Sequence, residues 1–290
     1  MSRGLNKCAA LRHCRSVDYQ EYPAPASLSR HVACVWRLTD PAPRAGIQTI
    51  YPDGRCELIA HLATRSRIWD AVRGWHEQSP TLYAAQRVTA VQLEATGALD
   101  DFGVRLQPAA SAIIARELEP LRDRVVDLAS LDPPVSVSLI DSARAFARGD
   151  PAPLWQLLER LAAAFPIDAK IEESVARIEC SGGGARIASL ARAAGWSVRT
   201  LQTRFLAAVG LTPKEFARVL RLQATLRALG GDSPLADLAC DAGFADQAHA
   251  TRELKRVTGL TPARLREELR RDQGSSTAIE IAAAFVRGHS

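Results

Sequence analysis

Long hydrophobic runs are missing from this chain of 290 residues. No apolar stretch approaches the roughly 18 residues that a helix needs to cross a bilayer. The first fifteen residues are polar and include Arg3, Lys7, Arg12 and Arg15, so they lack the apolar centre of a secretory signal. We therefore expect a cytoplasmic protein that makes no contact with a membrane.

Paired cysteines and other signatures of chemistry are absent as well. The six cysteines include no C-x-x-C pair, which argues against a disulfide framework and a structural zinc site. We interpret most of them as small apolar side chains, and a redox-sensing pair of Cys8 and Cys14 is the alternative. The glycine run at residues 182–184 lacks the GK[ST] ending of a phosphate-binding loop and indicates a helix end. Because no Ser/His/Asp or Cys/His spacing is recognisable, we expect no catalytic residue, no cofactor and no enzyme activity.

Lysine is scarce, and the basic residues are unevenly distributed. Only four of the 37 basic residues are lysines, so a lysine-rich arm is missing. Residues 1–184 hold 21 basic and 22 acidic residues, whereas residues 185–272 hold 15 and 9. The net positive charge therefore lies in a compact C-terminal third. This asymmetry indicates a partner that is nucleic acid or another anionic surface.

The length favours two domains, and the hydrophobic pattern changes where they would meet. Short, often alternating apolar segments predict strands at residues 32–39, 56–62, 88–96 and 102–107. Turn residues separate them, so we expect a small β-barrel or sandwich. From Ala109 onward apolar residues recur three and four positions apart, and we expect the chain to remain helical from there.

An internal repeat of about 49 residues is the most informative feature of the C-terminal third. Residues 187–216 and 234–265 share the same order of signals, with Gly195-Trp196 matching Gly243-Phe244. In each copy a short helix with small apolar residues ends at that glycine. The buried positions of this helix are Ile187, Leu190, Ala191 and Ala194 in the first copy, and Leu235, Leu238, Ala239 and Ala242 in the second.

Capping residues then start the next helices. Ser197 and Asp246 are suited to begin the second helix of each copy. Thr212 and Glu215 form a capping box around Pro213, which starts a long helix to about Leu229. This is the spacing of two linked helix-turn-helix units.

The outward faces of the two second helices are polar. In the first, Leu201 and Phe205, with Ala208, define the buried side, which leaves Arg199 and Thr203 outward and Gln202 on the flank. In the second, Ala250, Leu254 and Val257 are expected to be buried. Arg and Gln near the N-terminal end of such a helix match the edges of guanine and adenine in the major groove.

With these residues in place, the C-terminal region resembles the DNA-binding domain of AraC/XylS-type transcription regulators. The signature of the family is met by Gly243, Phe244, Asp246, Gln247, His249, Arg252, Lys255, Gly259, Thr261 and Pro262. The resemblance implies an all-α domain in which two helix-turn-helix units are joined by the long helix. It also implies the base-contacting residues Arg199, Gln202, Thr203, Gln247, Ala248 and Arg252. The chain departs from the family at Ala250 and Leu254, where aromatic residues are usual, so the second unit is expected to pack more loosely.

Other basic residues are better suited to phosphate, which gives affinity without sequence information. These candidates are Arg204, Arg218, Lys255 and Arg256, together with His249, for which a capping or packing role is an equal alternative.

The N-terminal region more weakly resembles the cupin-like sensing domain found in such regulators. The segments that carry this resemblance are VACVWRL, IYPDGRCELI and FGVRLQPAA. A metal-binding cupin would show a His-x-His pair, but His61 stands alone in its strand, so we predict no metal. Trp36, Tyr51 and Trp69 are candidates for an effector cavity, although core packing is the alternative use of each. The effector-binding residues are unknown.

The sequence thus predicts an α+β protein with a β-rich, barrel-like sensing and dimerisation domain over residues 1–108. A helical connector at 109–167, a double helix-turn-helix domain at 168–272 and a tail at 273–290 follow. We expect a one-component, sequence-specific regulator that binds double-stranded operator DNA and a small-molecule effector, with RNA polymerase as a partner if it activates, and a homodimer as a further expectation. A DNA-associated enzyme with a catalytic N-terminal domain and a non-specific nucleoid or protein-interaction scaffold are the alternatives.

Overall fold

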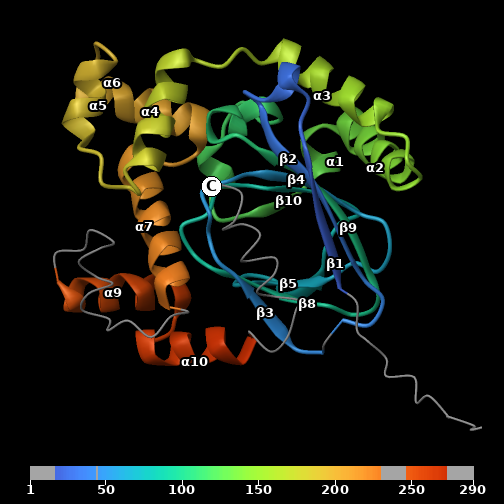
Figure 1. The fold of residues 1–290 in the computed structure, drawn as a ribbon. Helices are drawn as coiled ribbons and strands as arrows, with labels where there is room; N and C mark the ends of the chain where they lie inside the picture. Colours follow the sequence, from blue (N-terminus) through green and yellow to red (C-terminus); the bar gives the residue numbers. More distant parts are fainter. Residues whose placement is uncertain (1–16, 44, 230–245, 273–290) are drawn as a thin grey trace, which may run out of the picture.

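A computed structural model describes residues 17–43, 45–229 and 246–272 of the chain. The N-terminal half holds two antiparallel sheets (Figure 1). The strands of the first, in spatial order, are β1 (Asp18–Pro23), β2 (Val32–Asp40), β9 (Leu99–Leu106), β4 (Glu57–His61), β7 (Thr81–Ala84) and β10 (Val125–Asp127). Those of the second are β3 (Ile47–Ile50), β8 (Val91–Glu94), β5 (Arg67–Asp70) and β6 (Gly74–Glu77).

The β-rich domain predicted from sequence is therefore confirmed, but as two sheets that do not close into a barrel. The four expected strands correspond to β2, β4, β8 and β9. The remaining strands were not predicted. Most of these are only three or four residues long, and in β5 the exposed side chain is the apolar Trp69, so no clear alternation marks them.

Helices cover one face of the six-stranded sheet. They are α1 (Leu128–Leu131), α2 (Pro133–Ala147) and α3 (Ala152–Ala164). Along β4, Leu58 and Ala60 join the core beneath these helices, whereas Glu57 and Ile59 face the second sheet. Successive side chains of the strand thus point alternately into the core beneath the helices and into the space between the two sheets.

The expectation that the chain stays helical after Ala109 is wrong. Residues Pro108–Ile113 and Glu119–Leu121 form 3₁₀ turns, labelled η2 and η3, and β10 then pairs with β7. Pro108 and Pro120 each stand in the first turn of these segments, a position that tolerates proline because its N–H would be unpaired in any case. The region called a connector is therefore partly built into the β-domain. Another 3₁₀ turn, η1 (Ala26–Leu28), precedes β2.

The C-terminal region is helical, as predicted. Its described helices are α4 (Ala169–Cys180), α5 (Ile187–Ala193), α6 (Val198–Val209), α7 (Pro213–Leu229), α9 (Gln247–Thr258) and α10 (Pro262–Asp272). In Figure 1, α5 and α6 lie at one end of α7, and α9 and α10 lie at the other. Among these residues no helix is long and apolar enough to span a membrane.

Candidate nucleic-acid interface and cavity

The first two-helix unit consists of α5 and α6, joined by a tight turn. Gly195 ends α5 with a φ of +69°, a left-handed value that favours glycine. Ser197 accepts a hydrogen bond from the amide of Thr200 at 3.1 Å and so caps α6. Leu201 and Phe205 are fully buried. The predicted turn, cap and inner face are confirmed, although Ala208 is only half-buried.

The outer face of α6 carries Arg199, Gln202 and Thr203, all exposed. This is the face that the sequence assigned to base contacts. The structure brings the three side chains to one surface, and their contact with bases stays a prediction.

The second unit is described only in part. Gly243, Phe244 and the predicted buried positions of its first helix lie outside the described residues. In α9, Asp246 caps the helix by accepting the amide hydrogen of His249 at 2.6 Å. Ala250 and Leu254 are fully buried, so these smaller side chains are well covered. Five residues of α9 that the sequence assigned to contacts with DNA, namely Gln247, Ala248, Arg252, Lys255 and Arg256, are all exposed.

Three of the predicted phosphate-contacting residues, all arginines, have protein partners that the sequence did not indicate. Arg204 lies over the ring of Trp196 at 4.9 Å and within 3.4 Å of a carboxylate oxygen of Asp168. Arg218 on α7 forms an ion pair of 3.0 Å with Glu253 on α9. Arg256 reaches the same carboxylate at 3.3 Å. Glu253 therefore ties the helix that links the units to the outer helix of the second.

The β-domain contacts α7 in its first turn and again near its middle. Gly54 lies so close to Phe216 that a Cβ added there would be 2.8 Å from the ring. About two turns further along α7, Gln223 donates a hydrogen bond of 2.7 Å to the carbonyl of Pro52. Phe216 is fully buried, so this part of α7 belongs to a shared core rather than to a free linker. Nothing in the sequence pattern indicated it.

A second loop of the β-domain reaches α9. The amide of Ala90 donates to the carbonyl of Val257 at 3.2 Å. The loop is held by Asp123, whose Oδ1 accepts from the amides of Val88 and Thr89 at 2.9 and 3.0 Å. The β-domain thus contacts the linking helix and the outer helix of the second unit together.

Three ion pairs cross between the β-domain side and the helical region. They are Arg30 with Glu172 at 2.7 Å, Arg55 with Glu179 at 2.8 Å, and Arg122 with Glu215 at 3.0 Å. The Arg55 side chain is almost fully buried, so its pair is shielded from solvent more than the other two. These contacts fix the orientation of α4 and α7 against the sheets.

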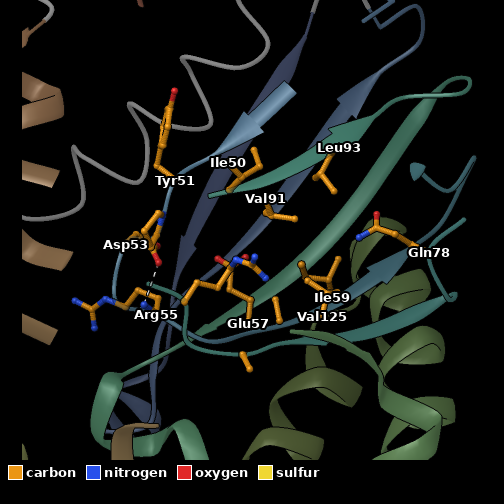
Figure 2. Close-up of a pocket in the computed structure, with 14 residues that line it drawn as sticks. Ile50, Tyr51, Asp53, Arg55, Glu57, Ile59, Gln78, Val91, Leu93 and Val125 are labelled. Atoms are coloured by element: carbon orange, nitrogen blue, oxygen red, sulfur yellow. Dashed lines mark hydrogen bonds between the residues drawn. The ribbon is translucent and has the colours of Figure 1, made fainter. Parts of the chain in front are cut away.

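A cavity of about 110 Å³ lies between the two sheets (Figure 2). Its lining comes from β3, β4, β7, β8 and β10 and from the segment at residues 51–55. The lining residues are Ile50, Tyr51, Pro52, Asp53, Arg55, Glu57, Ile59, Gln78, Ala84, Ala85, Arg87, Val91, Leu93 and Val125. Of the aromatic candidates from the sequence, Tyr51 lines the cavity, Trp36 is buried beside it, and Trp69 is 47% exposed.

The polar end of the cavity is built around the carboxyl groups of Glu57, which is buried, and Asp53, which is half-buried. Glu57 accepts hydrogen bonds from Trp36 Nε1 at 3.1 Å and Arg105 Nε at 2.9 Å. Burial raises the pKa of Glu57, opposed by the charge of Arg105. Burial likewise raises the pKa of Asp53, again opposed by Arg105. Both groups therefore sit where additional negative charge is unfavourable.

His61 and Cys56 are two further buried titratable groups of the β-domain. His61 is buried and its Nδ1 lies 2.6 Å from Asp101 Oδ1, so the isolated histidine has a carboxylate partner. No group of three or more metal-binding side chains occurs among the residues that the structure covers. Burial raises the pKa of Cys56 to about 11, which keeps this thiol protonated at neutral pH. Cys8 and Cys14 lie outside the described residues.

Comparison with known proteins finds two separate family matches along the chain. A family described as a helix-turn-helix domain matches residues 190–268, and a domain of unknown function, DUF6597, matches residues 20–127. A protein of Streptomyces antibioticus named as an AraC-like transcription regulator is 38% identical over 82 residues, which cover 28% of this chain and 27% of that protein. The match thus spans about a quarter of the curated relative.

Solved structures with a similar arrangement include ToxT of Vibrio cholerae. The structure from strain O395 is 11% identical, covers 81% of this chain and 96% of its own, and has a TM-score of 0.43. The structure of unsaturated fatty acid-bound ToxT from strain SCE256 is 10% identical. The match covers 80% of this chain and 93% of the ToxT chain, with a TM-score of 0.41.

Proposed function

We propose that the protein is a one-component transcription regulator that reads double-stranded operator DNA. The proposal starts from residues 190–268, which match an AraC-type helix-turn-helix domain. The observation that carries the proposal is the pair of capped helices, α6 and α9, with buried apolar faces and exposed Arg and Gln on the opposite face. The basic character of the same region supports it.

The two helices are assigned to successive major grooves on one face of the duplex. Such grooves are about 34 Å apart in B-DNA. Arg199, Gln202 and Thr203 on α6, and Gln247, Ala248 and Arg252 on α9, are the proposed base-contacting residues. Arg204, Arg218, His249, Lys255 and Arg256 are the proposed phosphate contacts. The ion pairs of Arg204, Arg218 and Arg256 within the protein imply that DNA must compete for these side chains.

Selection from a random DNA library at about 150 mM salt tests sequence reading, because non-specific attraction is weakened there. We expect an enriched motif with two boxes about one helical turn, roughly ten base pairs, apart. Folded protein that binds DNA without enriching any sequence would favour the scaffold alternative. Hydrolysis or modification of the bound DNA would favour the enzyme alternative.

Arg252→Ala separates base reading from phosphate attraction. We expect the variant to lose about 1–3 kcal/mol on the selected site and to relax specificity there, with little loss on random DNA. Arg160→Ala on α3 is the matched control, since Arg160 is exposed on a helix that packs against the β-domain. Equal losses on both DNAs would make Arg252 a phosphate contact instead.

We further infer that a small-molecule effector occupies the cavity between the sheets and changes the arrangement of the DNA-binding helices. The support is that residues 51–55 line the cavity and also contact α4 and α7, through Arg55, Pro52 and Gly54. The segment at 109–167 offers a second route, since Val125 lines the cavity and η2 packs against α6. Contact with RNA polymerase and homodimerisation belong to the same proposal, and sedimentation with and without operator DNA tests the second.

A further inference from the structure

The cavity between the sheets has an apolar wall along most of its length. Ile59 on β4, Val125 on β10, and Val91 and Leu93 on β8 supply much of this wall. Figure 2 shows Ile59 projecting toward Val91 and Leu93, whereas Tyr51 points away from this space. A molecule held in the cavity would therefore meet hydrocarbon on most sides, which is typical of sites for small molecules.

Gln78 brings a side-chain amide to one end of the cavity. It directly follows β6, lines the cavity and is only 7% exposed. In Figure 2 its amide is directed toward Leu93 and Ile59, and thus into the cavity. The backbone N–H of Gln78 donates to the carbonyl of Ser66 at 3.0 Å, but no residue in the described part of the chain forms a hydrogen bond with the side-chain amide. A buried amide without a protein partner favours a bound molecule that supplies one.

The Gln78 amide and the carboxyl group of Glu57 lie at opposite ends of the cavity. In the antiparallel pairing of β4 with β7, Glu57 lies opposite Ala84, the last residue of β7. Gln78 precedes Thr81, the first residue of β7, and so lies toward the other end of this strand pair. Ile59 is two residues along β4 from Glu57 and faces the same space. The apolar wall therefore separates the amide from the carboxyl group.

The charged residues of the lining do not call for a charged ligand. Glu57 accepts a hydrogen bond of 2.9 Å from Arg105 Nε, so its charge is compensated within the protein. Burial raises the pKa of Glu57, and a further negative charge beside it would be unfavourable. Arg87 donates to the backbone carbonyls of Thr89 and Asp123, at 3.2 and 2.7 Å. A neutral ligand suits this lining best.

The amide of a glutamine carries an acceptor and a donor side by side. Its complement is a group that also has a donor next to an acceptor, as in the pairing of glutamine with the edge of adenine. A primary carboxamide or a lactam has this arrangement and can form two hydrogen bonds with one glutamine. A ketone can only accept, so it would leave the carbonyl of the glutamine unpaired, which is unfavourable in a buried site.

We propose that this cavity binds a small neutral carboxamide or lactam, with its amide paired to the side chain of Gln78 and its hydrocarbon part along the wall formed by β4 and β8. The volume of about 110 Å³ is below the roughly 150 Å³ of a cavity that holds benzene, so a ligand of about five non-hydrogen atoms fits. The proposal rests on the proposed function only in calling this ligand an effector. Binding itself depends on the cavity alone.

Binding of propionamide to the full chain tests the proposal, with 2-butanone and propionate as probes of the same shape. Titration calorimetry and thermal shift at pH 7.5, with sodium chloride added to equalise ionic strength, cover dissociation constants from about 10 µM to 10 mM, the range suited to ligands of this size. Apolar burial alone would favour 2-butanone, since its methyl group replaces the polar NH₂ of propionamide. We expect propionamide to bind at least fivefold more tightly than 2-butanone, and propionate not to bind. Equal or tighter binding of either other probe, or no binding of any, would overturn the proposal.

Variants of Gln78 locate the site. Gln78→Met removes the amide and keeps the length of the side chain, so it should weaken propionamide binding at least fivefold and leave 2-butanone binding within about twofold of the wild type. Gln78→Asn withdraws the amide by one methylene and should cause the same loss, which keeps the test open if the Met variant does not fold. Gln92→Met is the matched control, because Gln92 is exposed on β8, on the face opposite to Val91 and Leu93. If folded Gln78 variants bind propionamide like the wild type, or if Gln92→Met loses binding equally, the proposal is wrong.

The same protein preparation separates this site from the proposed function. Propionamide binding without sequence enrichment in the DNA selection would leave the site standing and remove the regulator. Sequence enrichment without propionamide binding would leave the regulator standing and remove this ligand class.

Discussion

Replacing Glu253 by glutamine removes the carboxylate that ties α9 to α7. Its Oε2 lies 3.0 Å from Arg218 Nε and 3.3 Å from Arg256 Nη2. The three side chains are between a fifth and two fifths exposed, so each pair is partly screened by solvent. We expect the variant to lose about 1 kcal/mol of unfolding free energy, which lowers Tm by about 2–4 °C in a protein of this size.

The larger effect is expected on DNA binding. Carboxylate and phosphate compete for the same guanidinium groups, so the variant frees Arg218 and Arg256 for phosphate. Each phosphate neutralised steepens the slope of log K against log salt concentration by about 0.9, which gives a slope more negative by about 1.8 when both arginines bind. Fluorescence anisotropy with a random-sequence duplex between about 50 and 250 mM salt measures this slope.

The control is Glu77→Gln, which makes the same change in net charge and removes a surface ion pair of 2.6 Å with Arg65. This variant should leave the salt slope unchanged, because β6 belongs to the four-stranded sheet and not to the helical region that carries Arg218 and Arg256. If Glu253→Gln lowers Tm while its salt slope equals that of the wild type, Arg218 and Arg256 do not reach phosphate and the reasoning is refuted.

Thermal or denaturant unfolding of three further variants tests a contact of the β-domain with α7, a buried carboxyl group and the cap of α7. Gly54→Ala places a Cβ 2.8 Å from the ring of Phe216 at a φ of +82°. It should lower the unfolding free energy by at least about 1 kcal/mol more than Gly149→Ala, because Gly149 has a similar positive φ and no neighbour within 4 Å. Equal losses in the two variants would show that the ring moves freely. Burial raises the pKa of Glu57, so the folded state binds the proton of this carboxyl more tightly than the unfolded state does. The unfolding free energy of the wild type should therefore rise relative to that of Glu57→Gln as pH falls from about 8 to 5. A difference between the two proteins that does not change with pH would contradict this. Thr212→Ala removes a cap that accepts the amide hydrogen of Glu215 at 3.2 Å and should cost about 0.5–2 kcal/mol, whereas an unchanged Tm would show that the cap is not needed.

The C-terminal units were predictable because their signals are local. Ser197 and Asp246 cap the helices that follow them within three residues, and Gly210 and Gly259 end those helices with left-handed φ values. The buried positions recur at the helical period, so Leu201 and Leu254 could be assigned without knowledge of the rest of the chain.

The β-domain and the interface were less predictable because their contacts join distant residues. β10 has three residues and exists through its pairing with β7, about forty positions earlier. Glu253 forms an ion pair with Arg218, thirty-five positions earlier, and Arg55 forms one with Glu179, more than a hundred positions later. The cavity combines residues from five strands, so no sequence window holds its pattern.

The contacts of the β-domain with the two units differ in kind, and this bears on how an effector would act. The first unit shares a buried apolar core with it, in which Ala109 packs with Phe205 and Phe216. Among the described residues, the second unit meets it through the hydrogen bond from Ala90 to Val257 and through partly buried Tyr51. Opening a packed apolar core costs several kcal/mol, whereas a single hydrogen bond contributes about 1 kcal/mol. Because Tyr51 also lines the cavity, we expect ligand binding to shift the second unit while the first keeps its place.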